Sequence, residues 1–174
     1  LTVYWVVLSA SAERATEAEA SAAAFLQHAG RAEVRINQFQ DGFFPYIGGE
    51  IKGYFERLKQ EINPDWIFTH CGHDRHQDHR VVTELTWNTF RDHLILEYEI
   101  PKYDGDLGIP NCFVHLTEAT YQTKIAYLLH YFQSQENKHW FTQETFRAIL
   151  RLRGIEARAP EHLAEAFYCR KFVF

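Results

Sequence analysis

Residues 66–79 read WIFTHCGHDRHQDH, an apolar segment that runs without a break into a histidine-rich one. The aromatic and branched side chains from Trp66 to Thr69 are typical of a β-strand. In sheets built from parallel strands, ligands bind beyond the carboxyl ends of the strands. We therefore expect this segment to be a strand of an α/β protein, with functional side chains in the loop that follows it.

The segments on either side of this stretch alternate between strand and helix patterns. Residues 3–8 form a near-continuous apolar run, which is typical of a strand covered on both faces by helices. Further strands are expected at residues 34–39, 94–100, 113–116 and 166–174, and helices at residues 11–26, 51–62, 82–90, 118–132 and 143–152. This alternation predicts a Rossmann-like α/β fold with a mostly parallel sheet, helices on both faces and a single domain over residues 1–174.

The composition is that of an ordinary globular protein. Of the 174 residues, 46% are hydrophobic and 24% are charged, which excludes a disordered or fibrous chain. The formal net charge of −5 argues against binding to nucleic acid, and no apolar run reaches the ~18 residues of a membrane span. Three widely spaced cysteines, Cys71, Cys112 and Cys169, predict no disulfide framework and favour a reducing cytoplasm.

The histidine-rich loop carries the strongest functional signal. Four of the ten histidines recur at intervals of three residues, with two aspartates among them: His70, His73, His76 and His79, with Asp74 and Asp78. Imidazole is the commonest protein ligand of transition metals, and a nearby carboxylate fixes its tautomer. A catalytic zinc site needs three protein ligands and one open position. We expect this loop to supply one ligand together with acid or base groups; the alternative is a solvated polar loop.

The loop sequence resembles a known family. Residues 73–80, HDRHQDHR, are similar to the second motif, Asp-x-His-x-Asp-His, of the LmbE-like, or PIG-L, zinc-dependent N-deacetylases. Arg14 and Glu17 resemble the Arg-x-x-Glu of the helix after the family's second strand, and Asp41 resembles its loop aspartate. Residues 98–101, 134–135 and 164–167 are similar to further family blocks.

The resemblance implies an activity and assigns residues to it. His79 would bind Zn²⁺, and His76, made cationic by its neighbour Asp78, would stabilise the oxyanion or protonate the departing amine. The expected reaction removes an N-acetyl group from an amino sugar or a related small conjugate, in a protein that can be a homo-oligomer. Three residues are expected to contact the substrate or line its pocket: Arg14, Asp41 and Asp74.

One part of the family pattern is absent from this sequence. No His-Pro-Asp-Asp-Glu string, which would supply two zinc ligands and the general base, occurs in it. Residues 1–8 resemble the family's second strand, so the resemblance implies a first strand and motif loop upstream of Leu1. The 174-residue form alone is then expected to be inactive and nearly metal-free. Two alternatives remain: a metal-free, non-catalytic binding protein on the same fold, or a metallohydrolase of a different amide.

A basic stretch near the C-terminus has a simpler interpretation. Its members are Arg147, Arg151, Arg153 and Arg158. Charged residues on a helix usually form a solvated face. We expect these arginines to be exposed, at most forming a subunit contact or meeting an anionic part of a substrate.

Overall fold

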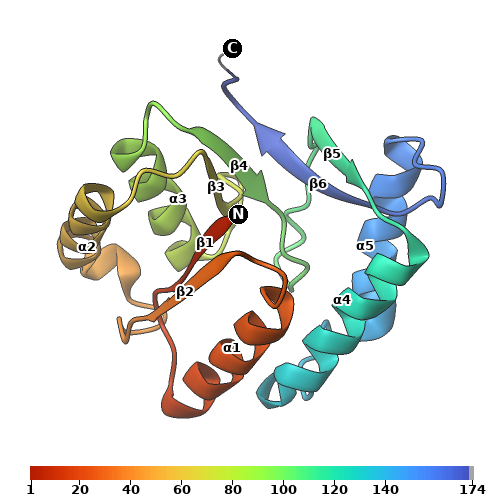
Figure 1. Ribbon diagram of the computed structural model, residues 1–174, viewed down its shortest axis with the longest axis horizontal. Helices are drawn as coiled ribbons and strands as arrows, with labels where there is room; N and C mark the ends of the chain where they lie inside the picture. The colour runs from red at the N-terminus through yellow and green to blue at the C-terminus, as the bar shows by residue number, and fades with distance from the viewer. Residues whose placement is uncertain (173–174) are drawn as a thin grey trace.

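The computed structural model describes residues 1–172, whose six strands form two sheets (Figure 1). The first sheet pairs β1 (Thr2–Val7) with β2 (Arg31–Ile36) in parallel. The second has the spatial order β3, β4, β6, β5, with the bounds Trp66–His70 for β3, Leu94–Tyr98 for β4, Cys112–His115 for β5 and Ala164–Cys169 for β6. The apolar half of the stretch 66–79 is therefore a strand, as predicted.

Five α-helices and two 3₁₀ turns connect these strands within the described residues. Their bounds are α1, Ala12–Phe25; α2, Gly48–Glu61; α3, Gln77–Thr89; α4, Glu118–Tyr131; α5, Gln143–Glu156; η1, Phe44–Tyr46; and η2, Gln133–Gln135. Three helices begin after a hydroxyl residue whose side chain accepts a hydrogen bond from a backbone N–H three residues later: Ser11, Thr117 and Thr142. Such caps satisfy backbone groups that a helix end leaves without partners, and they set where these helices begin.

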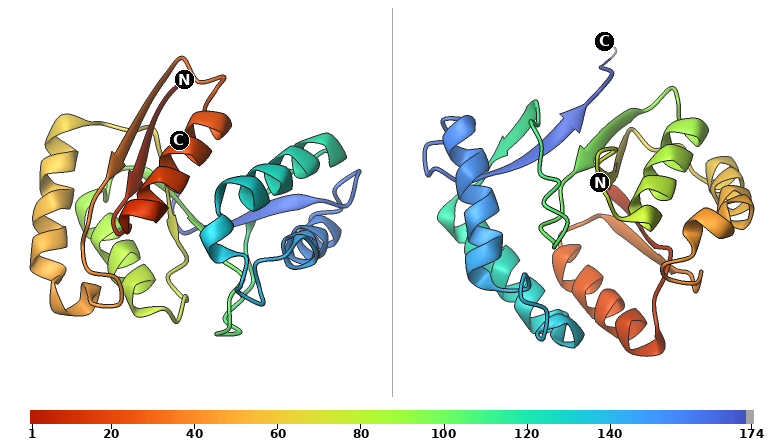
Figure 2. Two further views of the ribbon diagram at one scale, coloured as in Figure 1. Left: turned by 90° about the horizontal axis from the view of Figure 1, so that it is seen from below. Right: turned by 180° about the vertical axis from the view of Figure 1, so that it is seen from behind.

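Helices cover both sides of the sheets, as expected. On one side, Val6 of β1 and Ile67 of β3 pack against a core that α2 and α3 share, centred on Ile51. On the other side, Trp5 of β1 packs against Phe25 of α1, with ring centroids 6.2 Å apart. A second core lies between α4, α5 and the end of the chain: Tyr121, Ile125, Leu150 and Leu163. Figures 1 and 2 show α2 and α3 together on one flank and α4 and α5 on the other.

The expectation of a mostly parallel sheet is only partly met. The β1–β2 and β3–β4 pairs are parallel, but β6 runs antiparallel to both β4 and β5. A single helix between two strands returns the chain to its starting end, so β3 and β4 are parallel. Two helices, α4 and α5, separate β5 from β6, and the second helix reverses the direction once more.

The two sheets are not joined to each other. Over residues 1–172, no ladder of hydrogen bonds connects β1 to β3, so each of these strands is an edge. Two large side chains of β3 are unusually open, with Trp66 60% and Phe68 53% exposed. The expected single sheet is therefore divided between β1 and β3.

Element boundaries differ from expectation at a few ends. The strand expected to reach residue 100 ends at Tyr98, and the last strand covers Ala164–Cys169 rather than beginning at residue 166. The final part of that expected strand, residues 173–174, lies outside the described residues. None of the described helices has the length and apolar character needed to cross a membrane.

Candidate active site

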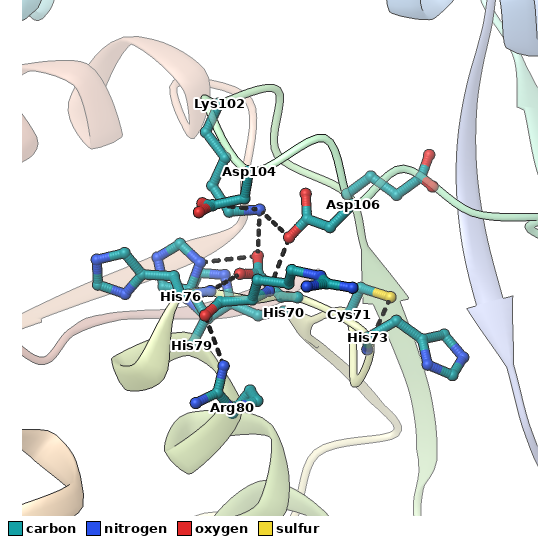
Figure 3. A network of polar contacts seen from close by, with 12 residues as sticks. His70, Cys71, His73, His76, His79, Arg80, Lys102, Asp104 and Asp106 are labelled. Atoms are coloured by element: carbon teal, nitrogen blue, oxygen red, sulfur yellow. Dashed lines mark hydrogen bonds and ion pairs between the residues drawn. The ribbon is translucent and has the colours of Figure 1, made fainter.

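The histidine-rich loop lies where β3 and β4 end (Figure 3). The Cys71 N–H donates to the Tyr98 carbonyl at 2.9 Å, and the Gly72 N–H donates to Glu97 Oε2 at 2.6 Å. Farther along, the Thr83 hydroxyl contacts the carbonyls of His70 and His79 at 2.8 and 2.9 Å. The start of the loop is thus attached to β4, and the end of β3 just before it is attached to α3.

His79 is oriented by a buried carboxylate. Its Nδ1 lies 2.8 Å from Asp74 Oδ2, and Asp74 Oδ1 accepts the His76 N–H at 2.7 Å. Burial by itself raises the pKa of Asp74, but the hydrogen bonds from His79 and from the His76 backbone outweigh it and lower that pKa to about 2. An ionised carboxylate only accepts, so the Nδ1–H of His79 is the donor, and in the neutral ring Nε2 has the lone pair. Histidines that bind metals are held in this way.

His76 also uses Nδ1 for a hydrogen bond within the protein, but as an acceptor and not as a donor. It is the cap of α3, and its Nδ1 accepts the Asp78 N–H at 3.3 Å. In the neutral ring the proton then lies on Nε2, so that nitrogen is a donor. The rings of His76 and His79 lie side by side with centroids 4.4 Å apart. One ring therefore offers a lone pair and its neighbour an N–H.

The expected pairing of the Asp78 carboxylate with His76 is wrong. Asp78 is buried, and its two oxygens accept the backbone N–H groups of Gly42 at 2.6 Å and Phe44 at 3.1 Å. Asp78 lies in the first turn of α3, where the buried amides of the 42–44 turn need an acceptor. Asp78 therefore joins the loop after β2 to the start of α3. Gly42 has φ +78°, a conformation that favours glycine in this turn.

The ring of His70 stacks on that of His79 and is uncharged at neutral pH. The two rings are stacked, with centroids 3.9 Å apart and planes 4° from parallel, and the Tyr98 ring lies 5.0 Å from His70. Burial, followed by the nearby charge of His79, lowers the pKa of His70 to about 3. His70 is therefore uncharged at neutral pH. Burial also raises the pKa of the Cys71 thiol, which is typical of an unreactive buried cysteine.

The remaining residues singled out in the sequence lie at different places. Asp41 is exposed beside Gly42, and therefore near the start of α3. Arg14 is exposed in the first turn of α1, and among the described residues no hydrogen bond or ion pair links its side chain to the histidine loop. Asp74, expected as a substrate contact, is buried and holds His79 instead.

Several charged contacts of this region were missed in the sequence. Lys102, in the loop after β4, places its ammonium 3.2 Å from Asp74 Oδ2 and 2.5 Å from Asp106 Oδ2. Arg153, expected on an exposed face, is buried and binds Glu99 at 2.8 Å. Asp106 lies only four residues from Lys102, but the Lys102–Asp74 and Arg153–Glu99 contacts join segments distant in the sequence, and no local pattern points to them.

The residues present do not form a zinc site by themselves. Within residues 1–172, no three His, Cys, Asp or Glu side chains are grouped so that they could hold a metal ion. In their neutral forms, the His79 ring has a lone pair on Nε2 and the neighbouring His76 ring has an N–H on Nε2. A zinc ion at this place needs further ligands from elsewhere.

Comparison with solved structures identifies the fold. A conserved protein, TT1542, from Thermus thermophilus is 18% identical, with a TM-score of 0.72 covering 100% of this chain and 84% of that one. The 4-carboxy-2-hydroxymuconate hydratase GalB from Pseudomonas putida KT2440 is 14% identical, with a TM-score of 0.68 over 98% and 85% of the two chains. An N,N'-diacetylchitobiose deacetylase from Pyrococcus horikoshii is 17% identical, with a TM-score of 0.61 over 97% and 72%. At these identities the likeness shows a shared fold alone.

Comparison of the sequence identifies the family. Residues 5–90 match PIG-L, described as GlcNAc-PI de-N-acetylase, whereas no curated protein matches the sequence. The matched segment contains the second half of β1, all of β2 and β3, and the histidines at positions 70, 73, 76 and 79. Residues 5–90 of this chain therefore belong to the PIG-L, or LmbE-like, family.

Proposed function

We propose that this protein hydrolyses the N-acetyl amide of an amino sugar or a related small conjugate, using one zinc ion and releasing a free amine and acetate. The observation that carries the proposal is the pair of rings at the end of β3. His79 keeps a lone pair on Nε2 because Asp74 accepts from its Nδ1, and His76 directs an N–H from its own Nε2. This pair lies in the segment that matches a de-N-acetylase family.

Each ring has a separate role in the proposed reaction. His79 would be a zinc ligand, and the bound ion would supply a Lewis acid and a water whose pKa is lowered to about 7. His76 would donate from Nε2 to the oxygen that becomes negative when the amide carbonyl is attacked, or to the departing amine. Asp74 holds His79, and Asp78 holds the turn beside Asp41, so neither carboxylate needs to contact the substrate.

The other zinc ligands would come from a further segment between β1 and β3. Both strands have free edges, and a strand placed between them would join the two sheets. The amides of Gly42 and Phe44, after β2, bind Asp78, after β3, so the carboxyl ends of the two sheets lie on the same side. A parallel strand inserted there would end beside His79. The open Trp66 and Phe68 of β3 are consistent with a covering segment.

The free cysteines and the solved structures support the compartment and the substrate class of the proposed reaction. Cys71, Cys112 and Cys169 are all free thiols, which favours the cytoplasm. The likeness to a deacetylase of N,N'-diacetylchitobiose supports a small N-acetylated sugar as the substrate class.

The proposal is tested on the protein as its gene encodes it. Metal analysis should find about one zinc per chain, and N-acetylglucosamine conjugates should release acetate and a primary amine in equal amounts. Removal of zinc with a chelator should abolish the reaction, and added zinc should restore it. Two results would overturn the proposal: no bound zinc, which would favour a binding protein, or hydration of an unsaturated acid without amide cleavage, the reaction named for GalB.

A further inference from the structure

Lys102 lies in the loop between β4 and β5 and carries a buried positive charge. Its side chain is 9% exposed, and those of its partners Asp74 and Asp106 are 2% and 6% exposed. Burial lowers the pKa of Lys102, but hydrogen bonds to Asp106 and Asp74 outweigh this effect and raise it. A lysine is rarely this buried unless it is paired. Figure 3 shows it reaching from the loop toward the histidine rings.

The surroundings of Lys102 leave no room for a substrate. Cys71, Ile100 and Leu107 line the space around the Lys102, Asp74 and Asp106 side chains, and that space has a volume of about 10 Å³. A cavity of that size holds at most one water molecule. Among the described residues, the partners of the Lys102 ammonium are the carboxylates of Asp74, Asp104 and Asp106.

Lys102 and its partner Asp106 attach the loop after β4 to the histidine loop. Asp74 Oδ2 contacts both its ammonium at 3.2 Å and His79 Nδ1 at 2.8 Å. Asp106 Oδ2 contacts the same ammonium at 2.5 Å and accepts the Arg75 N–H at 2.7 Å. The loop after β4 is thus attached to the histidine loop at two consecutive residues, Asp74 and Arg75.

We propose that Lys102 is a positioning residue: by bridging Asp74 and Asp106, it holds the Asp74 carboxylate against His79 Nδ1, so that His79 presents Nε2 to the site. The importance of Nε2 rests on the proposed function, whereas the positioning of the ring does not. Which ring nitrogen carries the proton depends on the hydrogen bond made by the other. Without the ammonium, the Asp74 carboxylate loses the partner that keeps its Oδ2 beside His79.

The test compares three variants of the metal-free full chain by long-range ¹⁵N–¹H spectroscopy of the histidine rings, at a pH where His79 is neutral. In the unmodified protein the Nδ1–H tautomer of His79 should dominate. Lys102→Met should shift His79 toward a mixture of tautomers. Asp106→Asn should cause a smaller shift in the same direction, and it decides the question if Lys102→Met does not fold. Asp104→Asn is the matched control, because Asp104 lies in the same loop, 4.0 Å from the ammonium, but is 40% exposed.

A second readout links positioning to the metal. In the protein that binds zinc, Lys102→Met should weaken zinc binding by about 10–100-fold, the usual effect of removing a partner of a metal-binding histidine, and Asp104→Asn should leave it unchanged. The positioning role is overturned if folded Lys102→Met and Asp106→Asn both keep the Nδ1–H tautomer dominant. If the unmodified protein binds no zinc, the proposed function fails, and the tautomer measurement still decides the role of Lys102.

Discussion

Two buried charge clusters lie at the carboxyl end of β4, and they differ in whether all of their polar side-chain atoms have hydrogen-bond partners. The histidine cluster consists of Asp74, His76, His79 and Lys102, and the glutamate cluster consists of Glu99, Arg153 and Tyr168. In the glutamate cluster, Glu99 accepts two short bonds from Arg153 Nη2 at 2.8 and 2.9 Å, one from the Tyr168 hydroxyl at 2.8 Å and one from the Gly108 N–H at 2.9 Å. Its carboxylate is fully occupied.

In the histidine cluster, only one nitrogen of each ring has a hydrogen-bond partner among the described residues. Asp74 is as closely bound as Glu99, but His76 and His79 each use Nδ1 within the protein and keep Nε2 for another partner. Buried polar groups that are completely paired hold a fold together, whereas groups held firmly with one atom free are suited to binding or catalysis. Burial of charge alone therefore does not identify a functional site, and the proposed function rests instead on the two ring nitrogens.

The largest expected effect is that of His79→Ala. Removal of the proposed ligand should lower zinc content and activity together, by more than the roughly 10²–10⁴-fold that one acid or base group contributes. Metal analysis and amide hydrolysis measured on the same preparation would check this. A high zinc concentration should restore part of the activity. Full activity without bound zinc would contradict the assignment of His79.

His76→Ala should separate chemistry from metal binding. Zinc content should remain, because His76 is not a proposed ligand, but the rate should fall by roughly 10²–10⁴-fold as the Nε2 donor is lost. Excess zinc should not restore it. If His76→Ala removes the metal and His79→Ala does not, the roles of the two rings are reversed.

Arg153→Met tests whether the glutamate cluster is structural. It leaves Glu99 buried without its cation, and loss of one partner of a buried pair costs about 3–5 kcal/mol. Urea unfolding should show this loss of stability, while the folded variant should keep its zinc. Arg151→Met, which changes an exposed arginine two residues away on α5, is the control and should be within about 0.5 kcal/mol of the unmodified protein. A stable Arg153→Met that has lost its zinc would place this cluster in the site.

The smallest expected effect is a pH dependence at Tyr168. Burial, together with the hydrogen bond to Glu99 and the charge of Glu99, raises the pKa of Tyr168 well above its ordinary value of 10. The folded state therefore favours the neutral phenol. Its contribution to stability is complete below about pH 10 and is lost as the pH rises toward the folded value. Unfolding of the unmodified protein and of Tyr168→Phe, compared at pH 8 and pH 11, should show a smaller loss of stability in the variant.

Local features of the sequence were sufficient for most of the elements. Residues 66–70 formed β3 as expected, and the helix expected over residues 11–26 begins directly after the Ser11 cap. The strand pattern that precedes the histidines correctly indicated a loop at the end of β3, although His70 is the last residue of that strand and His79 lies in the first turn of α3. These predictions succeeded because propensities and caps act over a few residues.

Contacts between distant segments were not predictable in the same way. The Asp78 carboxylate was expected to pair with the neighbouring His76, but it binds amides of the 42–44 turn. Arg153 was expected in a solvated arginine stretch, but it is buried against Glu99 on another element. Neither partner lies close in the sequence, so neither could be assigned before the chain was folded.

The sequence by itself determined the α/β class, the positions of most strands and helices, and the loop in which the candidate site lies. These properties depend on side-chain periodicity and on interactions within one or two turns of chain. Only the tertiary structure decided that Asp74 is shared by His79 and Lys102. It also decided that, within residues 1–172, β1 and β3 are separate edges and neither Nε2 of His76 and His79 has a hydrogen-bond partner. Hydrogen bonds and ion pairs depend on distances of about 3 Å and on direction, and such distances between remote residues are defined only once the strands and helices have packed.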